Sequence, residues 1–129
     1  MKKITKLLSL TMVLGLMLLM SCSKDKDNSP SGSHKVIFKA IASSGSSIQT
    51  ALYTAGSGKT ENFTSLTGET WTSTEYTIDS KDLMVNFGAN AIGKDATSTL
   101  IVEIWVDGVK KADGKSTGAI LSASANYAF

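Results

Sequence analysis

Apolar and polar side chains alternate with a period of two along most of the chain after residue 34. The alternation is most regular in 100–106, where Leu100, Val102, Ile104 and Val106 share one side. Successive side chains of a strand lie on opposite faces, so this period predicts strands with one face in a core and the other in water. No segment has a convincing helical period. The expected strands lie at about 35–43, 48–54, 61–64, 83–87, 100–106 and 118–129.

The same alternation predicts which side chains share a face. In 48–54, one face carries Ile48, Thr50, Leu52 and Thr54, and the other carries Gln49, Ala51 and Tyr53. In the last strand, one face carries Ala119, Leu121, Ala123, Ala125, Tyr127 and Phe129.

Turn-forming residues separate the predicted strands. Asp107-Gly108 is a strong signal for a two-residue hairpin, whose central residues need positive φ. Gly56-Ser57-Gly58, Thr67-Gly68 and Ala112-Asp113-Gly114 predict further reversals. About seven strands with such frequent turns predict an all-β domain over 34–129, built as a small antiparallel β-sandwich.

The chain begins with a segment typical of a secretory signal. Lys2, Lys3 and Lys6 precede an apolar run over 7–20. An apolar run of this length suits a signal peptide, because a membrane-spanning helix needs about 20 apolar residues. We therefore expect residues 1–21 to be a signal peptide.

The only cysteine follows this run. Leu19-Met20-Ser21-Cys22 resembles a bacterial lipobox, in which the cysteine thiol is acylated and the chain is cut between Ser21 and Cys22. Acyl chains contribute about 0.8 kcal/mol for each buried methylene and so anchor a protein firmly when several are present. The resemblance implies that Cys22 is lipidated and tethers the chain to a membrane. The alternatives are a free cysteine after an ordinary signal, or an uncleaved anchor.

Residues 22–33 are small, polar or charged and predict a flexible tether. Lys24-Asp25-Lys26-Asp27 resembles the charged signal that sends many lipoproteins of the Bacteroidetes to the cell surface. The alternative is an ordinary charged linker. We expect a lipid-anchored protein of the bacterial outer membrane, either periplasmic or surface-exposed.

Charge argues against a nucleic-acid partner. Three of the 13 lysines lie in the expected signal peptide, which leaves ten lysines against 11 acidic residues. The chain contains no arginine, the residue whose planar fork best recognises phosphates and guanines. We expect no nucleic-acid partner.

Motifs for catalysis, nucleotides or metals are missing or incomplete. Gly56-Ser57-Gly58-Lys59-Thr60 resembles the end of a phosphate-binding loop, but Tyr53 stands where that loop needs a glycine. His34 is the sole histidine and has no second histidine or thiol to complete a transition-metal site. We expect no enzyme activity, no nucleotide, no cofactor and no metal.

Three aromatic residues are candidates for a partner surface: Trp71, Tyr76 and Trp105. Trp105 lies on the face of its strand opposite to Leu100, Val102, Ile104 and Val106, together with Ile101, Glu103 and Asp107. The alternative is that these aromatic residues cover a sheet or fill the second side of a small core.

The last third of the chain suggests a family. The run from Ser98 through Ile104-Trp105-Val106-Asp107-Gly108 to the ending Ser122-Ala123-Ser124-Ala125-Asn126-Tyr127 resembles the extracytoplasmic domain of the MmpS proteins ("mycobacterial membrane protein, small"). The resemblance implies an immunoglobulin-like sandwich and an accessory role beside an RND-type (resistance-nodulation-division) transporter. MmpS proteins are anchored in the membrane by a transmembrane helix, whereas this chain has a cysteine that is expected to be lipidated. Binding of a surface glycan or another protein, or a purely structural role, are the alternatives.

Overall fold

The computed structural model of the chain describes residues 32–56, 58–79, 81 and 84–129. These residues form nine β-strands and no helix. The strands are β1 (Ser33–Ala42), β2 (Ser47–Ala55), β3 (Lys59–Phe63), β4 (Thr70–Thr72), β5 (Tyr76–Asp79), β6 (Met84–Ile92), β7 (Thr99–Val106), β8 (Val109–Thr117) and β9 (Ile120–Ala128).

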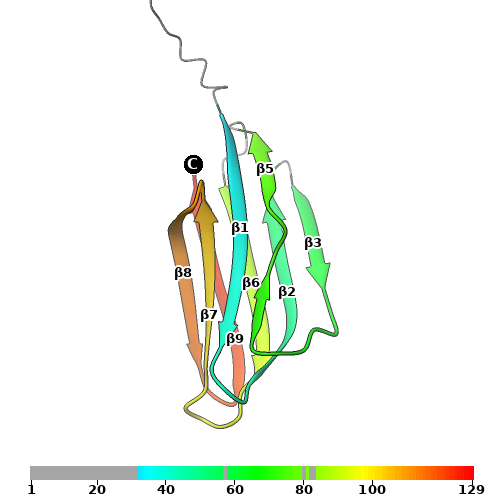
Figure 1. Ribbon diagram of the computed structural model, residues 1–129, viewed down its shortest axis with the longest axis vertical. Helices are drawn as coiled ribbons and strands as arrows, with labels where there is room; N and C mark the ends of the chain where they lie inside the picture. Colours follow the sequence, from blue (N-terminus) through cyan, green and yellow to red (C-terminus); the bar gives the residue numbers. More distant parts are fainter. Residues whose placement is uncertain (1–31, 57, 80, 82–83) are drawn as a thin grey trace, which may run out of the picture. The chain divides into compact units, whose positions relative to one another are not determined.

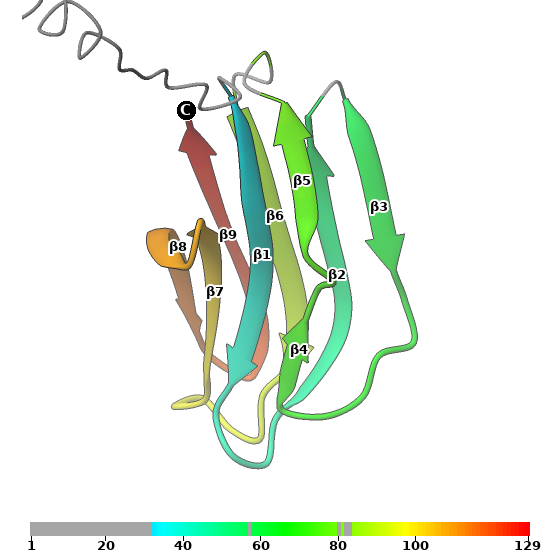
Figure 2. The same ribbon diagram turned by 45° about the horizontal axis from the view of Figure 1, so that its top comes forward.

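The strands form two antiparallel sheets that lie face to face (Figure 1). Sheet A has five strands: β1, β7 and β8 are neighbours in that order, and β4 and β5 both pair with the other edge of β1. Figure 2 shows β4 and β5 following one another along this edge. Sheet B has four strands in the order β3-β2-β6-β9. The prediction of an all-β antiparallel sandwich is confirmed, with nine strands in place of about seven.

The core lies between the two sheets. Leu100, Val102 and Ile104 of β7 are fully buried, as their alternation predicts. Phe38 of β1 stacks on Tyr53 of β2 with 4.6 Å between ring centroids. Large aromatic rings from both sheets therefore fill the middle of the sandwich, and burying apolar surface of this kind is the main term that stabilises such a fold.

A short interruption separates β4 from β5 and explains part of the higher strand number. Ser73 lies in the gap, where its backbone N–H donates to the Phe38 carbonyl. The Phe38 N–H in turn donates to Ser73 Oγ, at 3.0 Å. A side-chain oxygen thus replaces a backbone carbonyl, so β1 stays hydrogen-bonded although the regular ladder is broken.

A β-bulge in β2 changes the faces predicted for 48–54. Ile48 is opposite Ala91, but Thr50 is opposite Asn90, so Gln49 is an extra residue. A bulge of one residue reverses the alternation that follows it. The prediction that Ile48 shares a face with Thr50, Leu52 and Thr54 is therefore wrong: Ile48, Ala51 and Tyr53 are buried, and Leu52 is 45% exposed.

One predicted turn is correct and another is wrong. Asp107 and Gly108 have φ of 51° and 80° and connect β7 to β8. The predicted reversal at 112–114 lies inside β8. Gly114 is required there by a close approach, because a Cβ atom at this position would overlap the Ser124 carbonyl oxygen of β9.

Candidate functional site

Trp105 lies on the outer face of sheet A. Its neighbours Ile104 and Val106 are buried, so the alternation along β7 turns the Trp105 indole outward. Ile37 of β1 is its cross-strand neighbour. The indole is half-buried by the side chains around it. The structure thus places Trp105 on the face expected from the sequence, while its use in partner binding stays a prediction.

Two oppositely charged side chains hold the Trp105 indole in place. The Trp105 Nε1–H donates a hydrogen bond of 2.7 Å to Glu103 Oε2, and Lys39 Nζ lies 4.1 Å from the centre of the indole ring. Lys39 is directly opposite Glu103 on β1. A cation–π contact at an exposed site contributes about 0.5–1 kcal/mol, and a hydrogen bond to a carboxylate is stronger than a neutral one. Together these contacts favour one orientation of the indole.

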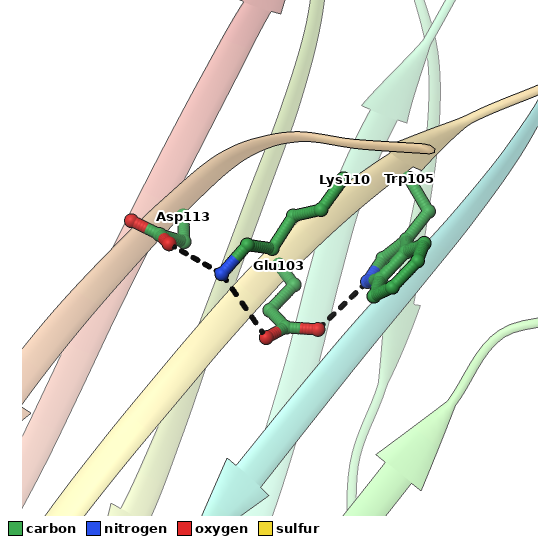
Figure 3. A network of polar contacts seen from close by, with 4 residues as sticks. All are labelled: Glu103, Trp105, Lys110 and Asp113. Atoms are coloured by element: carbon green, nitrogen blue, oxygen red, sulfur yellow. Dashed lines mark hydrogen bonds and ion pairs between the residues drawn. The ribbon is translucent and has the colours of Figure 1, made fainter. Parts of the chain in front are cut away.

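Lys110 of β8 extends this arrangement (Figure 3). Its Nζ lies 2.8 Å from Asp113 Oδ2 and 3.6 Å from Glu103 Oε1. The Asp113 carboxylate, chiefly through this hydrogen bond, raises the pKa of Lys110. Glu103 therefore lies between a lysine on one side and the indole on the other, and its two carboxylate oxygens each have a partner.

The Asp107-Gly108 hairpin brings Lys110 to this face, and a second β-bulge follows it in β8. Ile104 is opposite Ala112, but Trp105 is opposite Lys110, so Lys111 is the extra residue in β8. Lys110 lies between the hairpin and the bulge, so its pairing with Trp105 follows from the two-residue turn. Without the extra residue, Asp113 would be opposite Val102 and face the core, since side chains alternate. The bulge is therefore what places the Asp113 carboxylate opposite Glu103 and within reach of Lys110.

Apolar side chains surround the charged ones on the outside of sheet A. Ile37 is opposite Trp105, and Ile41 is opposite Ile101. Ile41 is 39% exposed. We call this surface the Trp105 face; it consists of Ile37, Lys39, Ile41, Ile101, Glu103, Trp105, Lys110 and Asp113.

Sequence reasoning missed Lys39, Lys110 and Asp113 as parts of this surface. The period of two does place Lys39 on the outside of its strand, which is a usable signal. Its position beside the indole depends on the pairing of β1 with β7, which joins segments more than 60 residues apart. The Asp107-Gly108 hairpin fixes Lys110 opposite Trp105, whereas the position of Asp113 depends on the bulge, which has no marker in the sequence.

Trp71 and Tyr76 lie elsewhere. Trp71 is opposite Ala40, and Tyr76 is opposite Val36; both partners face the core. Trp71 contacts the ring of Phe87, with 5.7 Å between centroids. The two side chains are partly buried and pack against the core. The structure therefore does not join Trp71, Tyr76 and Trp105 in one surface.

His34 and Asp107 meet at the start of β1. Asp107 Oδ2 lies 2.7 Å from His34 Nδ1, and Asp107 Oδ1 accepts from the Lys35 N–H at 2.9 Å. These two hydrogen bonds, that of His34 first, lower the pKa of Asp107. The imidazole also stacks on Phe129. Asp107 lies in the turn after β7, as the predicted hairpin requires, and not on the strand face of Trp105 where it was also expected; its carboxylate fixes the first residues of the domain.

The expected lipidation and cleavage site at Ser21 and Cys22 lies outside the described residues, as do the signal peptide and most of the tether. Among the residues described, no helix is long and apolar enough to cross a membrane. In the same part of the chain, no three His, Cys, Asp or Glu side chains are grouped so that they could hold a metal ion.

Neither a scan against models of protein families nor a search of curated proteins finds a match for this chain. The resemblance to the MmpS domain therefore stays a prediction from the sequence.

Proposed function

We propose that this chain is a non-catalytic lipoprotein of the bacterial cell envelope, anchored in the outer membrane by acyl chains on Cys22. Its sandwich domain binds another envelope protein through the Trp105 face. The lipobox-like segment and the polar tether support the anchor, because together they hold a folded domain near a membrane and leave it free to reach a partner.

The Trp105 face is the observation that carries the binding role. Tryptophan is among the residues that contribute most to protein interfaces, and it does so best where neighbouring groups limit access of water. Here Lys39 and Glu103 already hold the indole, so little side-chain freedom is lost when a partner covers it. Ile37, Ile41 and Ile101 supply apolar area around it.

The resemblance to MmpS domains makes a subunit of an RND-type exporter our preferred partner. The Trp105 face suits a protein, because it combines a central aromatic ring with aliphatic side chains and paired charges of both signs. A surface module that binds glycans or another protein, or a structural surface lipoprotein, are the alternative functions. The proposal assigns no catalytic residue, cofactor or metal.

Photo-crosslinking in cells tests the proposal with the full, anchored chain. A photoreactive residue replaces Ile101 on the Trp105 face in one variant and Asn126 on sheet B in another. We expect a specific protein adduct only from position 101, identified by mass spectrometry. Adding Trp105→Ala should reduce that adduct about tenfold, since an interface tryptophan commonly contributes more than about 1.4 kcal/mol.

Phe129→Ala is the matched control, because it removes an exposed aromatic ring at the end of β9 and leaves the Trp105 face intact. It should leave the adduct unchanged. Equal crosslinking from positions 101 and 126, or an adduct that survives Trp105→Ala, contradicts the proposed surface. If the adduct contains a protein that is not an exporter subunit, the proposed binding surface stands and the proposed transport role is contradicted.

A further inference from the structure

The outer face of sheet B differs in chemistry from the Trp105 face. The strands β2, β6 and β9 contain no charged residue. Their outward side chains, with those of β3, lie in rows across the sheet: Thr60, Thr54, Asn86 and Asn126 form one row, and Asn62, Leu52, Gly88 and Ser124 form the next. We call these two rows, with Thr50, Asn90 and Ser122 beyond them, the neutral face.

Most side chains of the neutral face are amides or hydroxyls. Each such group offers both a donor and an acceptor. Two contacts within the face hold side chains in place: Asn90 Nδ2 donates to Thr50 Oγ1 at 2.9 Å, and the hydroxyls of Thr54 and Thr60 are 3.1 Å apart. The face is therefore an ordered, uncharged surface that can form many hydrogen bonds with a flat ligand.

A shallow hollow lies in the middle of this face. It has a volume of about 230 Å³, and its outward-facing lining residues include Leu52, Asn86, Gly88, Ser124 and Asn126. Gly88 leaves the space because it has no side chain. A side chain would have room at this position, because a Cβ atom added to Gly88 would lie 3.6 Å from its nearest neighbour, the Ala123 carbonyl oxygen, which is an ordinary van der Waals contact.

The chemistry of the face selects one class of ligand. Nucleic acids and other polyanions need cationic side chains, and the described part of this face has none. Protein interfaces favour aromatic residues, methionine and arginine at their centre, whereas here the central large side chain is Leu52. A neutral sugar has hydroxyl groups that match amides and hydroxyls, and a C–H face that can cover one aliphatic side chain.

We propose that the neutral face binds neutral polysaccharides, with one sugar unit seated in the hollow over Gly88 against Leu52. Asn86 and Asn126 flank the hollow in the adjacent row and hydrogen-bond to sugar hydroxyls. Thr54 and Ser124 add hydroxyl partners. The site is separate from the Trp105 face and does not depend on the proposed protein partner.

Affinity electrophoresis of the full chain tests this site. The protein runs in native gels that contain dextran, yeast mannan, xyloglucan or, as an anionic comparison, polygalacturonate, with a detergent that has no sugar headgroup. We expect retardation by at least one neutral polymer and none by polygalacturonate. Gly88→Val, which fills the hollow, should weaken the retardation about tenfold.

Gly88→Val should remain folded, because valine favours a strand and the site has room for its Cβ atom; a melting temperature close to that of the wild type checks this. A second variant, Asn126→Asp, places a charge on the exposed surface without a change of shape and should also weaken binding. Trp105→Ala should leave it unchanged, which separates this site from the protein-binding surface.

Three results would overturn the inference. The first is no retardation by any of the neutral polymers. The second is stronger binding to polygalacturonate than to the neutral polymers. The third is binding that Trp105→Ala abolishes and Gly88→Val leaves intact, since the sugar would then lie on sheet A.

Discussion

Tyr53 presents a polar atom in the apolar centre of the molecule. Its ring is 99% buried and lies between Phe38 and Tyr76, at 4.6 and 4.9 Å between centroids. The hydroxyl is buried and forms no hydrogen bond of ordinary geometry in the described part of the chain, although Tyr76 and Glu61 lie near enough to affect its pKa. A buried hydroxyl without a partner costs about 1–3 kcal/mol. The ring therefore stabilises the core while its hydroxyl opposes that effect.

We expect Tyr53→Phe to leave the free energy of unfolding at about pH 7 unchanged or to raise it by about 1 kcal/mol, because the ring contacts remain and the unpaired hydroxyl is removed. Urea denaturation measures this directly. Tyr127→Phe, at a partly exposed site, is the control. A loss of stability specific to Tyr53→Phe would show that the hydroxyl has a partner in solution.

The same hydroxyl predicts a response to alkali. Burial, with smaller effects of Tyr76 and Glu61, raises the pKa of Tyr53 above its ordinary value. The unfolded chain then loses this proton near pH 10 while the folded protein keeps it, so stability falls as the pH rises above about 10. The fall should be smaller in Tyr53→Phe, and an equal fall in both proteins would contradict the assignment.

At the scale of elements, β8 and β9 close one side of the sandwich although they belong to different sheets. The Ser122 N–H donates to Ser116 Oγ at 3.2 Å near the turn that joins them. Further along, Gly114 allows the two backbones to approach. This closure protects the edge of each sheet, which would otherwise offer unpaired backbone groups.

We expect Gly114→Ala to destabilise the domain by about 2 kcal/mol or more, because the added methyl group overlaps the Ser124 carbonyl and forces β8 away from β9. For a domain of this size that is a fall in melting temperature on the order of 10 °C. Gly88→Ala is a matched control, since it makes the same change in the middle of a strand where space is available. Equal melting temperatures would refute the close packing of β8 on β9.

At the scale of the whole molecule, the two sheets present different outer surfaces. Sheet A carries Trp105 among paired charges and aliphatic residues, and sheet B carries mainly amides and hydroxyls around Leu52, with exposed Met84, Ile92 and Ile120 at the ends of its strands. A sandwich leaves both outer faces accessible, because the core lies between its sheets. The two proposed binding surfaces therefore do not overlap, since they lie on the outer faces of different sheets.

The proposed lipid anchor also concerns the whole chain. We expect Cys22→Ala to prevent acylation, so that the protein is either released from membranes or left with its signal uncleaved. Fractionation of cells and the mass of the N-terminal peptide measure both outcomes. Ser23→Ala is the control and should be processed normally. Normal membrane retention together with normal cleavage in Cys22→Ala would contradict the lipid anchor.

The sequence by itself determined the features that depend on neighbouring residues. Period two in 100–106 identified a strand and its buried face, and Asp107-Gly108 identified its hairpin, because side-chain alternation and turn conformation are local properties. The outward position of Trp105 followed from the same alternation. These local signals are sufficient for the class of fold and for the part of the Trp105 face that β7 supplies.

The tertiary structure decided what depends on distant residues. The bulges at Gln49 and Lys111 arise from the pairing of whole strands, and they turn Tyr53 into the core and Asp113 toward Glu103 and Lys110. The sequence predicted a turn at Gly114, but this residue lies inside β8, where the close approach of β9 requires a glycine. The neutral face exists only because four strands from separate parts of the chain pair in one register, and no local pattern specifies that register.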